Sequence, residues 1–344
     1  MDSYKNELEW IIEQNLPWEL FENKTIVISG ATGMIGKCMI DLIMMRNKKG
    51  YSPIYVTALS RNEKVAKKRF GEYWNLDWFK FLPCDVNVAI PECSHADYVI
   101  HAAGNTHPKL YAGDPIGTIL TNVTGTKNML DYAVKYNAKQ FCFLSTVEIY
   151  GENRGDVDYF DESYLGYLDC NTLRAGYPES KRAGEALCNA YREAEGMPFV
   201  IPRLSRIYGT TMLESDTKAI SQFVKKAMAG EDIVLKSAGT QMYSYTFVTD
   251  AVNAILHIML LGKDGEAYNV SDSKSDISLK ELAAVLAKKA GTNVVFELPD
   301  DMEKKGYSTA TKAMLAPDKL EALGWKARVS IDKGMEIILS DSTE

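Results

Sequence analysis

The segment Lys24–Gly36, KTIVISGATGMIG, constrains the fold of this chain more than any other stretch. A run of β-branched apolar residues at 26–28 predicts a buried strand. Glycines spaced three apart follow it at once, and 34–45 is mostly apolar and predicts a helix. These glycines are Gly30, Gly33 and Gly36. The segment therefore predicts a strand that turns tightly into a helix.

Such a turn predicts a binding site for a pyrophosphate. The unpaired N–H groups and the positive dipole end of the helix point at one spot. Gly30 would permit the tight turn, Gly33 the close approach of a phosphate, and Gly36 close packing of helix and strand. The alternative is a loop with ordinary turn glycines, but the flanking strand and helix favour a dinucleotide. The other residues of the turn that we expect to contact it are Thr32, Met34 and Ile35.

Strands and helices alternate along the chain and predict an α/β fold. We expect strands at 54–59, 79–84, 96–103, 140–146 and 199–204, and long helices at 115–136 and 176–195. This spacing is typical of a doubly wound parallel Rossmann sheet with right-handed crossovers. After residue 205 the elements become shorter, which predicts a smaller C-terminal α/β lobe that holds the substrate.

We therefore expect three regions. These are an amphipathic helix extension at 1–23, a dinucleotide-binding Rossmann domain at 24–204, and mainly a substrate lobe at 205–344, with some strands returning to the main sheet. The apolar positions of 3–15 predict the first helix. It would pack either on the first domain or on a second subunit.

Composition excludes several classes of function. The net charge of −7 argues against a general binder of nucleic acid or membrane surfaces. The longest apolar stretch, 251–261, is too short to span a bilayer. The six cysteines show no CxxC pair or Cys/His cluster, so we expect reduced thiols and a cytoplasmic protein. No apolar run follows the first residues, Met-Asp-Ser-Tyr-Lys, so we expect no signal peptide. Four scattered histidines predict no metal site.

Residues after the predicted strands complete the cofactor site. The second strand ends at Ser60 and Arg61, with no acid to bind the two ribose hydroxyls of NAD, so Arg61 favours NADP. Alternatively, Arg61 is a solvated surface charge. The third strand is followed by Asp85 and Val86. The fourth ends in the small residues Ala102, Ala103 and Gly104, which would let a flat ring come close.

Tyr177 and Lys181 are the first candidate catalytic pair. Their i, i+4 spacing places both side chains on one face of a predicted helix. A nearby ammonium lowers the pKa of a tyrosine, which can then take a proton from a substrate hydroxyl. Chance also produces this spacing in a chain rich in tyrosine and lysine. Thr146 and Glu148 follow the fifth predicted strand, where the alternatives are a helix N-cap and a solvated acid.

The order of these motifs resembles the extended short-chain dehydrogenase/reductase family. The resemblance covers about 24–340 and is carried by Gly30-x-x-Gly33-x-x-Gly36, Asp85, His101-Ala-Ala-Gly104, Asn122, Ser145-Thr146 and Tyr177-x-x-x-Lys181. Within it, Thr121-Asn122-x-x-Gly125-Thr126 and Arg174-Ala-Gly-Tyr177 are most similar to UDP-glucuronate decarboxylases. The segment Thr146-x-Glu148-Ile-Tyr150-Gly151 is similar to one shared by those enzymes and dTDP-glucose 4,6-dehydratases.

The resemblance implies an NAD(P)-dependent enzyme that acts on a nucleoside-diphosphate sugar, with NAD+ as the usual cofactor. Tyr177, assisted by Lys181, would take the proton of the sugar C4 hydroxyl while hydride passes to the cofactor. Thr146 would hydrogen-bond the same oxygen, and Glu148 would handle a proton at C5. Asn122 would hold Lys181 through water. The hydride then returns, so the cofactor is recycled.

Departures from the family pattern leave the net reaction open. Val147 replaces the aspartic acid of dehydratases, so epimerisation and decarboxylation rank ahead of dehydration. Tyr243 stands where decarboxylases carry an arginine, and Arg206 replaces the usual asparagine. Lys218 lies in the segment that runs along the nucleoside diphosphate. We predict substrate contacts from these last three residues and from His107.

Two other functions stay open. An NADPH-dependent reductase of a keto-sugar or other carbonyl would use the same fold, and Arg61 favours it. A dinucleotide sensor without activity is disfavoured by the intact Tyr177 and Lys181. The family also implies a homodimer, joined through a four-helix interface of the helices at 115–136 and 176–195.

Overall fold

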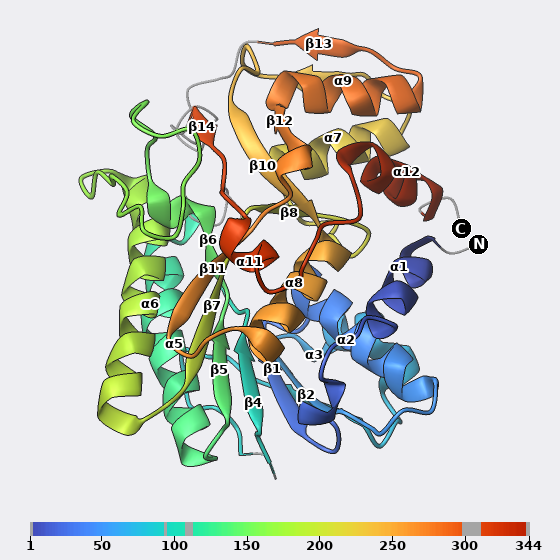
Figure 1. Cartoon of the computed structure of the whole chain (residues 1–344). Coiled ribbons are helices and arrows are strands. Elements are labelled where there is room, and N and C mark those ends of the chain that lie inside the picture. The colour runs from blue at the N-terminus through green and yellow to red at the C-terminus, as the bar shows by residue number, and fades with distance from the viewer. Residues whose placement is uncertain (1–2, 93–94, 107–112, 298–310, 342–344) are drawn as a thin grey trace.

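The computed structural model describes residues 3–92, 95–106, 113–297 and 311–341, and a parallel sheet lies at its centre (Figure 1). The strand order is β3-β2-β1-β4-β5-β7-β11, and β6 also pairs with β7. The strands are β1 (Thr25–Ser29), β2 (Tyr55–Ser60), β3 (Phe79–Pro83), β4 (Tyr98–His101), β5 (Gln140–Phe143), β6 (Ser145–Thr146), β7 (Phe199–Leu204) and β11 (Glu266–Val270). The order reverses between β1 and β4, which opens a crevice at their carboxyl ends. The predicted fold class is confirmed.

Helices cover both faces of this sheet. One face carries α2 (Met34–Lys48), α3 (Glu63–Phe70) and α8 (Val248–Leu261), and the other carries α5 (Pro115–Lys135) and α6 (Gly176–Glu195). Within β1, Ile26 and Ile28 belong to one buried cluster while Val27 belongs to the opposite one. A strand buried on both faces is apolar throughout, which explains the run at 26–28.

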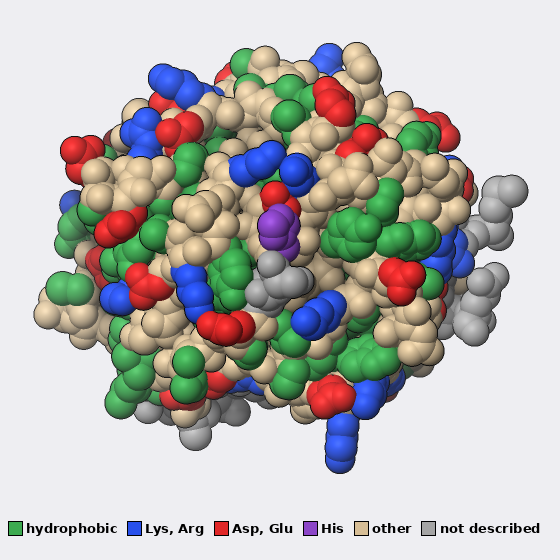
Figure 2. Space-filling view, turned by 90° about the horizontal axis from the view of Figure 1, so that it is seen from below, with side chains coloured by type: hydrophobic (Ala, Val, Ile, Leu, Met, Phe, Trp, Pro, Cys, Tyr) green, Lys and Arg blue, Asp and Glu red, His purple; other side chains and the backbone are tan. Residues whose placement is uncertain are grey.

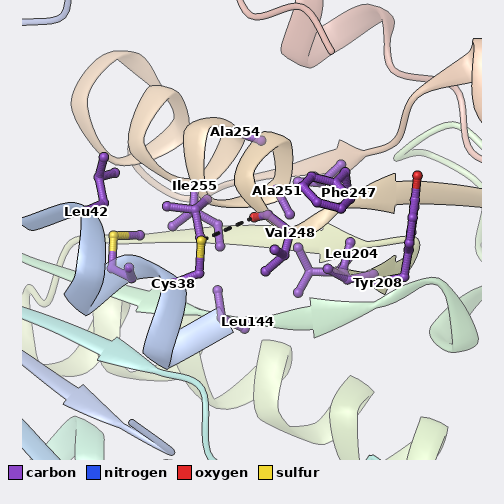
Figure 3. Close-up of a cluster of buried hydrophobic side chains, with 14 of the residues drawn as sticks. Cys38, Leu42, Leu144, Leu204, Tyr208, Phe247, Val248, Ala251, Ala254 and Ile255 are labelled. Carbon is purple, nitrogen blue, oxygen red and sulfur yellow. Dashed lines mark hydrogen bonds between the residues drawn. The ribbon is translucent and has the colours of Figure 1, made fainter. Parts of the chain in front are cut away.

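The helix α8 joins the later part of the chain to the sheet. Figure 3 shows Cys38 and Leu42 of α2 beside Ala251 and Ile255 of α8. The Cys38 thiol lies 3.9 Å from the Val248 carbonyl oxygen. Leu144 and Leu204 reach the same cluster from the strand side. Burial along almost the whole of α8 fixes the second lobe against the first.

The second lobe lies above the carboxyl ends of the large sheet in Figure 1. β8 (Arg206–Tyr208) follows β7 after one residue and pairs with β10 (Met242–Phe247), which also pairs with β12 (Asp276–Ser278) and β14 (Lys312–Ala313). A separate pair joins β9 (Ile233–Leu235) to β13 (Val294–Phe296). The lobe's helices include α7 (Ala219–Met228), α9 (Leu279–Ala290) and α11 (Asp318–Glu321).

The N-terminal helix α1 (Ser3–Ile12) packs on this chain's own α2, α8 and α12 (Ile331–Asp341). Its buried residues include Leu8, Ile11 and Ile12. Glu7 pairs with Arg328 at 2.9 Å and with Lys333. The helix therefore packs on the first domain through α2 and on the region 205–344 through α8 and α12.

The fifth predicted strand, 140–146, differs from the observed elements. It is interrupted at Leu144, so that β5 pairs with β4 and β7 whereas β6 pairs only with β7 among the described strands. In this register Leu144 lies opposite Pro202, which has no N–H to donate, so the pairing with β7 is interrupted there. The Leu144 side chain enters the core, and its carbonyl oxygen accepts a hydrogen bond from Lys181, which makes it part of the site described below.

Three further features bear on the sequence expectations. In the described ranges no helix is long and apolar enough to cross a membrane, and no group of three or more His, Cys, Asp or Glu side chains could hold a metal ion. The described cysteines are free thiols. Figure 2 shows basic and acidic side chains interspersed over the described part of the face seen from below. The described part of this face therefore has no large area of a single charge sign.

Candidate active site

The glycine-rich turn has the conformation that its sequence predicts. Gly30 has a φ of +66°, and a Cβ there would lie 2.6 Å from the Ala102 carbonyl oxygen at the end of β4. A Cβ at Gly36 would lie 2.7 Å from the Ala31 carbonyl oxygen. Only glycine fits these positions without movement of the backbone. The turn thus brings the ends of β1 and β4 together at the start of α2.

Gly33, the N-cap of α2, is the open part of the turn. A Cβ at Gly33 would meet the Gly30 carbonyl oxygen at 3.1 Å and, apart from its chain neighbours, no other described residue within 4 Å. No side chain caps the helix at this end. The first N–H groups of α2 are therefore available to an anion. This geometry fits a dinucleotide pyrophosphate.

The residues expected at the adenosine end follow neighbouring strands. The Thr32 hydroxyl lies 2.7 Å from that of Ser60, which ends β2. Arg61 is exposed. Asp85, after β3, accepts a hydrogen bond from the Asn87 N–H at 3.0 Å, and Val86 is buried. These positions form one edge of the sheet beside the turn.

The other end of the crevice brings β4, α5 and α6 together. A Cβ on Gly104 would lie 3.3 Å from Asn122 Oδ1 and 3.8 Å from Lys181 Nζ. Asn122 is fully buried, and its side-chain amide donates to the Ser180 hydroxyl at 2.9 Å. Its Oδ1 has no hydrogen-bond partner among the described residues. A buried acceptor of this kind fits a water, and the water link to Lys181 stays a prediction.

Lys181 is directed at the break in the sheet. Its ammonium donates to the Leu144 carbonyl oxygen at 2.8 Å and lies 4.6 Å from the centre of the Phe143 ring. Burial lowers the pKa of Lys181 to about 8, against the attraction of Glu185. A small change of environment therefore decides whether this lysine is charged near neutral pH.

Tyr177 is buried beside Thr146 and Glu148. Burial raises the pKa of Tyr177 above its ordinary value and the charge of Glu148 adds to this, while a hydrogen bond with Thr146 and the charge of Arg174 oppose it. The sequence predicts a lowered pKa for Tyr177, and this is wrong for the protein without cofactor or substrate, where the pKa is raised. The reason is that desolvation outweighs the neighbouring hydrogen bond and positive charge.

The Glu148 carboxylate is paired with Arg174. This contact was not predicted from the sequence. One Arg174 nitrogen, Nη2, donates to both carboxylate oxygens at 3.1 and 3.3 Å, and each side chain is 20% exposed. Arg174 was predicted only as part of a motif. Its position three residues before Tyr177 was the available signal, because residues spaced i, i+3 on a helix lie on one face.

The predicted substrate contacts gather on the second lobe. The Arg206 guanidinium lies 3.7 Å from the centre of the Tyr243 ring, across the β8–β10 pair. Lys218 lies 3.9 Å from Asp216. Burial lowers the pKa of Lys218 while Asp216 raises it, and both Arg206 and Glu148 act on it electrostatically. His107 lies outside the described residues.

Fold and site together define an NAD(P)-dependent enzyme with a dinucleotide crevice covered by a second lobe. A sequence model of the NAD dependent epimerase/dehydratase family matches residues 26–271. The chain belongs to this family, which confirms the resemblance drawn from its motifs.

Curated relatives support this assignment over nearly the whole chain. The chain is 29% identical to UDP-glucuronic acid decarboxylase 5 of Arabidopsis thaliana over 323 residues, which are 93% of this chain and 89% of the relative. It is 27% identical to UDP-glucuronic acid decarboxylase 1 of Danio rerio, over 96% of this chain and 76% of the relative.

Solved structures share the fold at lower identity. The dTDP-glucose 4,6-dehydratase DesIV from Streptomyces venezuelae, solved with NAD and TYD bound, has a TM-score of 0.79 at 21% identity, over 93% of this chain and 97% of that one. UDP-glucuronic acid 4-epimerase from Bacillus cereus, in complex with UDP-glucuronic acid and NAD, has a TM-score of 0.78 at 18% identity, over 93% and 99%.

Proposed function

We propose that this protein converts a nucleoside-diphosphate sugar by transient oxidation at C4, with epimerisation or decarboxylation as the net reaction. The observation that carries the proposal is the convergence of Thr146, Glu148, Tyr177 and Lys181 at the carboxyl ends of the central strands. Relatives named as UDP-glucuronic acid decarboxylases and a fold neighbour holding UDP-glucuronic acid support the substrate class. Dehydration ranks third, because Val147 has no acidic group where dehydratases carry an aspartic acid.

Proton transfer at C4 is the part assigned to Tyr177. Because burial raises its pKa, Tyr177 needs positive charge nearby to lose its own proton, and only then can it accept the proton of the C4 hydroxyl. Lys181, one helical turn away, would supply that charge. Thr146 would orient the substrate hydroxyl through the hydrogen bond it shares with Tyr177.

Glu148 is assigned the proton at the neighbouring carbon, C5. A 4-keto group acidifies that position, so a carboxylate held close to it would act as base or acid. The contact with Arg174 fixes the orientation of this carboxylate. Such orientation contributes to rate because misplaced groups lose much of their effect.

The cofactor would occupy the turn at Gly30–Gly36 and the edge formed by Ser60, Arg61, Asp85 and Val86. The uncapped N-terminus of α2 and the closely packed glycines fit its pyrophosphate. When bound, it accepts and returns hydride. The exposed Arg61 favours a 2′-phosphate and hence NADP+, whereas the bound NAD of the fold neighbours favours NAD+.

The second lobe would hold the sugar nucleotide. Lys218 would meet the diphosphate, and Arg206, with its guanidinium over Tyr243, would offer positive charge where decarboxylases carry their arginine. His107 is a further proposed substrate contact. An arginine at this place favours a sugar that carries an acidic group.

We also propose a cytoplasmic homodimer joined through α5 and α6. These helices pack on each other, and apolar side chains near their amino ends are exposed: Ile116 by 71% and Leu173 by 66%. Exposed apolar surface of this kind is typical of protein interfaces. Sedimentation at micromolar concentration would show a dimer; a monomer would contradict the proposal.

A release experiment tests the function. The purified protein is denatured, and the nucleotide that comes off is identified by mass spectrometry. Recovery of NAD+ or NADP+ near one per chain supports recycling. An empty protein that consumes one NADPH per product would instead indicate a keto-sugar or carbonyl reductase.

A further inference from the structure

The buried carboxylate of Glu185 lies on α6, one turn beyond Lys181. It accepts hydrogen bonds from the Ser145 hydroxyl at 2.5 Å and from Arg203 Nε and Nη2 at 3.2 and 2.7 Å. Ser145 and Arg203 face each other in the register of β6 and β7. Glu185 therefore links α6 to β6, the strand that carries Ser145 and its neighbour Thr146.

Arg203 extends this network to the remaining elements of the site. Its Nη1 donates to the Tyr150 hydroxyl at 2.9 Å and to the Glu162 carbonyl oxygen at 2.9 Å. Tyr150, which ends the short helix that carries Glu148, donates in turn to Asn269 Oδ1 at 2.7 Å. A fully satisfied buried network of this kind rigidifies its surroundings.

Glu185 also supplies negative charge to Lys181. The titratable groups that act on Lys181 or respond to it are Glu185 and Cys188 on α6 and His101 on β4. Burial raises the pKa of the Cys188 thiol, and burial together with Lys181 lowers the pKa of His101 to about 3. Both are therefore neutral at pH 7, and the acidic group that remains among them is Glu185, whose carboxylate pairs with Arg203 at 2.7 Å.

We propose that Glu185 is a positioning residue that keeps Lys181 in its ammonium form and holds Ser145, so that Thr146 meets Tyr177. The proposal deepens the proposed function, because it takes those three residues as the catalytic groups. It adds a third member to the face of α6, in the spacing Tyr177-x-x-x-Lys181-x-x-x-Glu185. Removing one partner of a buried ion pair leaves the other uncompensated, so the variants must separate charge from folding.

Glu185→Gln removes the charge and keeps an oxygen that can accept from Ser145. The probe is NADH, whose affinity is measured by fluorescence from about pH 6 to about pH 10, since Lys181 is a proposed cofactor contact. In the wild type, the affinity should fall as pH rises through about 8, where Lys181 loses its proton. In Glu185→Gln this midpoint should move down by about one pH unit, which lowers the affinity about fivefold at the wild-type midpoint. An unchanged midpoint would overturn the proposal.

Two further variants separate this effect from damage to the fold. Glu162→Gln alters a carboxylate of the same network that accepts from the Asn269 N–H, and should leave the midpoint in place. If Glu185→Gln does not fold because Arg203 is left unpaired, the double variant Glu185→Gln/Arg203→Met removes both charges. Its midpoint should still move down, but by less, because loss of the Arg203 cation favours the ammonium form of Lys181. The same midpoint in that variant and the wild type would equally overturn the proposal.

Ser145→Ala tests the second part of the proposal, that Glu185 positions Thr146 through Ser145. It leaves the Glu185–Arg203 pair intact, so the NADH midpoint should not move, while turnover of the nucleotide sugar that the wild type converts should fall about tenfold. Unchanged turnover would refute positioning through Ser145. If the wild type converts no nucleotide sugar, the proposed function fails, and the NADH titration still decides the role of Glu185.

Discussion

Arg174 donates from one nitrogen to both carboxylate oxygens of Glu148, at 3.1 and 3.3 Å. Both side chains are mostly buried, and Arg174 lies three residues before Tyr177, in the turn that leads into α6. The contact therefore fixes Glu148 relative to the helix that carries Tyr177 and Lys181. Because both groups are largely removed from water, loss of one would leave the charge of the other poorly compensated.

Arg174→Gln should release Glu148 without emptying the cofactor site. We expect turnover to fall about 10- to 100-fold, because Glu148 loses its fixed orientation, with NADH affinity unchanged. Steady-state kinetics and NADH titration measure the two. Arg192→Gln, which breaks a surface pair with Asp264, is the matched control. Equal turnover in both variants would show that the contact is only structural.

Gly30→Ala should destabilise the fold far more than Gly50→Ala. Both glycines have positive φ, +66° and +88°, but a Cβ at Gly30 meets backbone at 2.6 Å while one at Gly50 meets nothing within 4 Å. We expect about 1 kcal/mol lost at Gly50 and about 3 kcal/mol or more at Gly30. Urea denaturation gives both values, and similar losses would contradict the close approach of β1 and β4.

Arg61 should decide between the two dinucleotides. If its guanidinium meets a 2′-phosphate, Arg61→Gln should weaken NADPH binding about tenfold and leave NADH binding unchanged. Fluorescence titration with both cofactors measures this. Lys64→Gln, which removes another exposed cation of the same segment, controls for the general loss of positive charge. A wild type that binds NADH in preference to NADPH would identify Arg61 as a solvated surface charge.

His101 should make the protein sensitive to acid. Its ring is fully buried, with Nδ1 2.7 Å from the Ser29 hydroxyl, and burial lowers its pKa from 6.5 to about 3. Below pH 6.5 His101 is protonated in the unfolded chain but stays neutral in the folded chain. The free energy of unfolding therefore falls by up to about 1.4 kcal/mol per pH unit down to about pH 3. Above pH 6.5 this residue adds no pH dependence.

His101→Asn should therefore flatten the loss of stability between pH 6.5 and 3 relative to the wild type, even if it is less stable at pH 7. Urea denaturation at a series of pH values measures the slope. His95→Asn removes an exposed histidine and controls for the substitution itself. Parallel slopes for His101→Asn and the wild type would contradict a neutral, buried His101.

The sequence predicts much of this architecture because its elements are strongly patterned. β7 and α6 begin and end where the sequence pattern predicts, and the glycine spacing locates the turn before α2. The helix α3 escaped prediction because Ala66 and Phe70 are its only buried residues among highly charged neighbours. The break at Leu144 was missed because it depends on the register with β7, which places Pro202, a residue without an N–H, opposite Leu144.

The site was harder to predict where contacts depend on tertiary structure. The i, i+4 spacing of Tyr177 and Lys181 predicts a shared face, yet nothing local shows how strongly burial acts on the tyrosine pKa. Glu185 and Arg203 meet because α6 crosses over β7, and Asn269 joins them from β11. Such networks follow from the packing of elements and have no signature in the local sequence.

Transfer of a label tests the central claim most directly. Sugar nucleotides deuterated at C4 (UDP-glucuronic acid, UDP-glucose and dTDP-glucose) are incubated with the protein and NAD+ or NADP+. The products are analysed by mass spectrometry and reduced cofactor by absorbance. We predict a product from at least one substrate that keeps deuterium at C4, with no net reduced cofactor. No product from any of them, or a product formed only with one NADPH consumed per turnover, would contradict transient oxidation at C4.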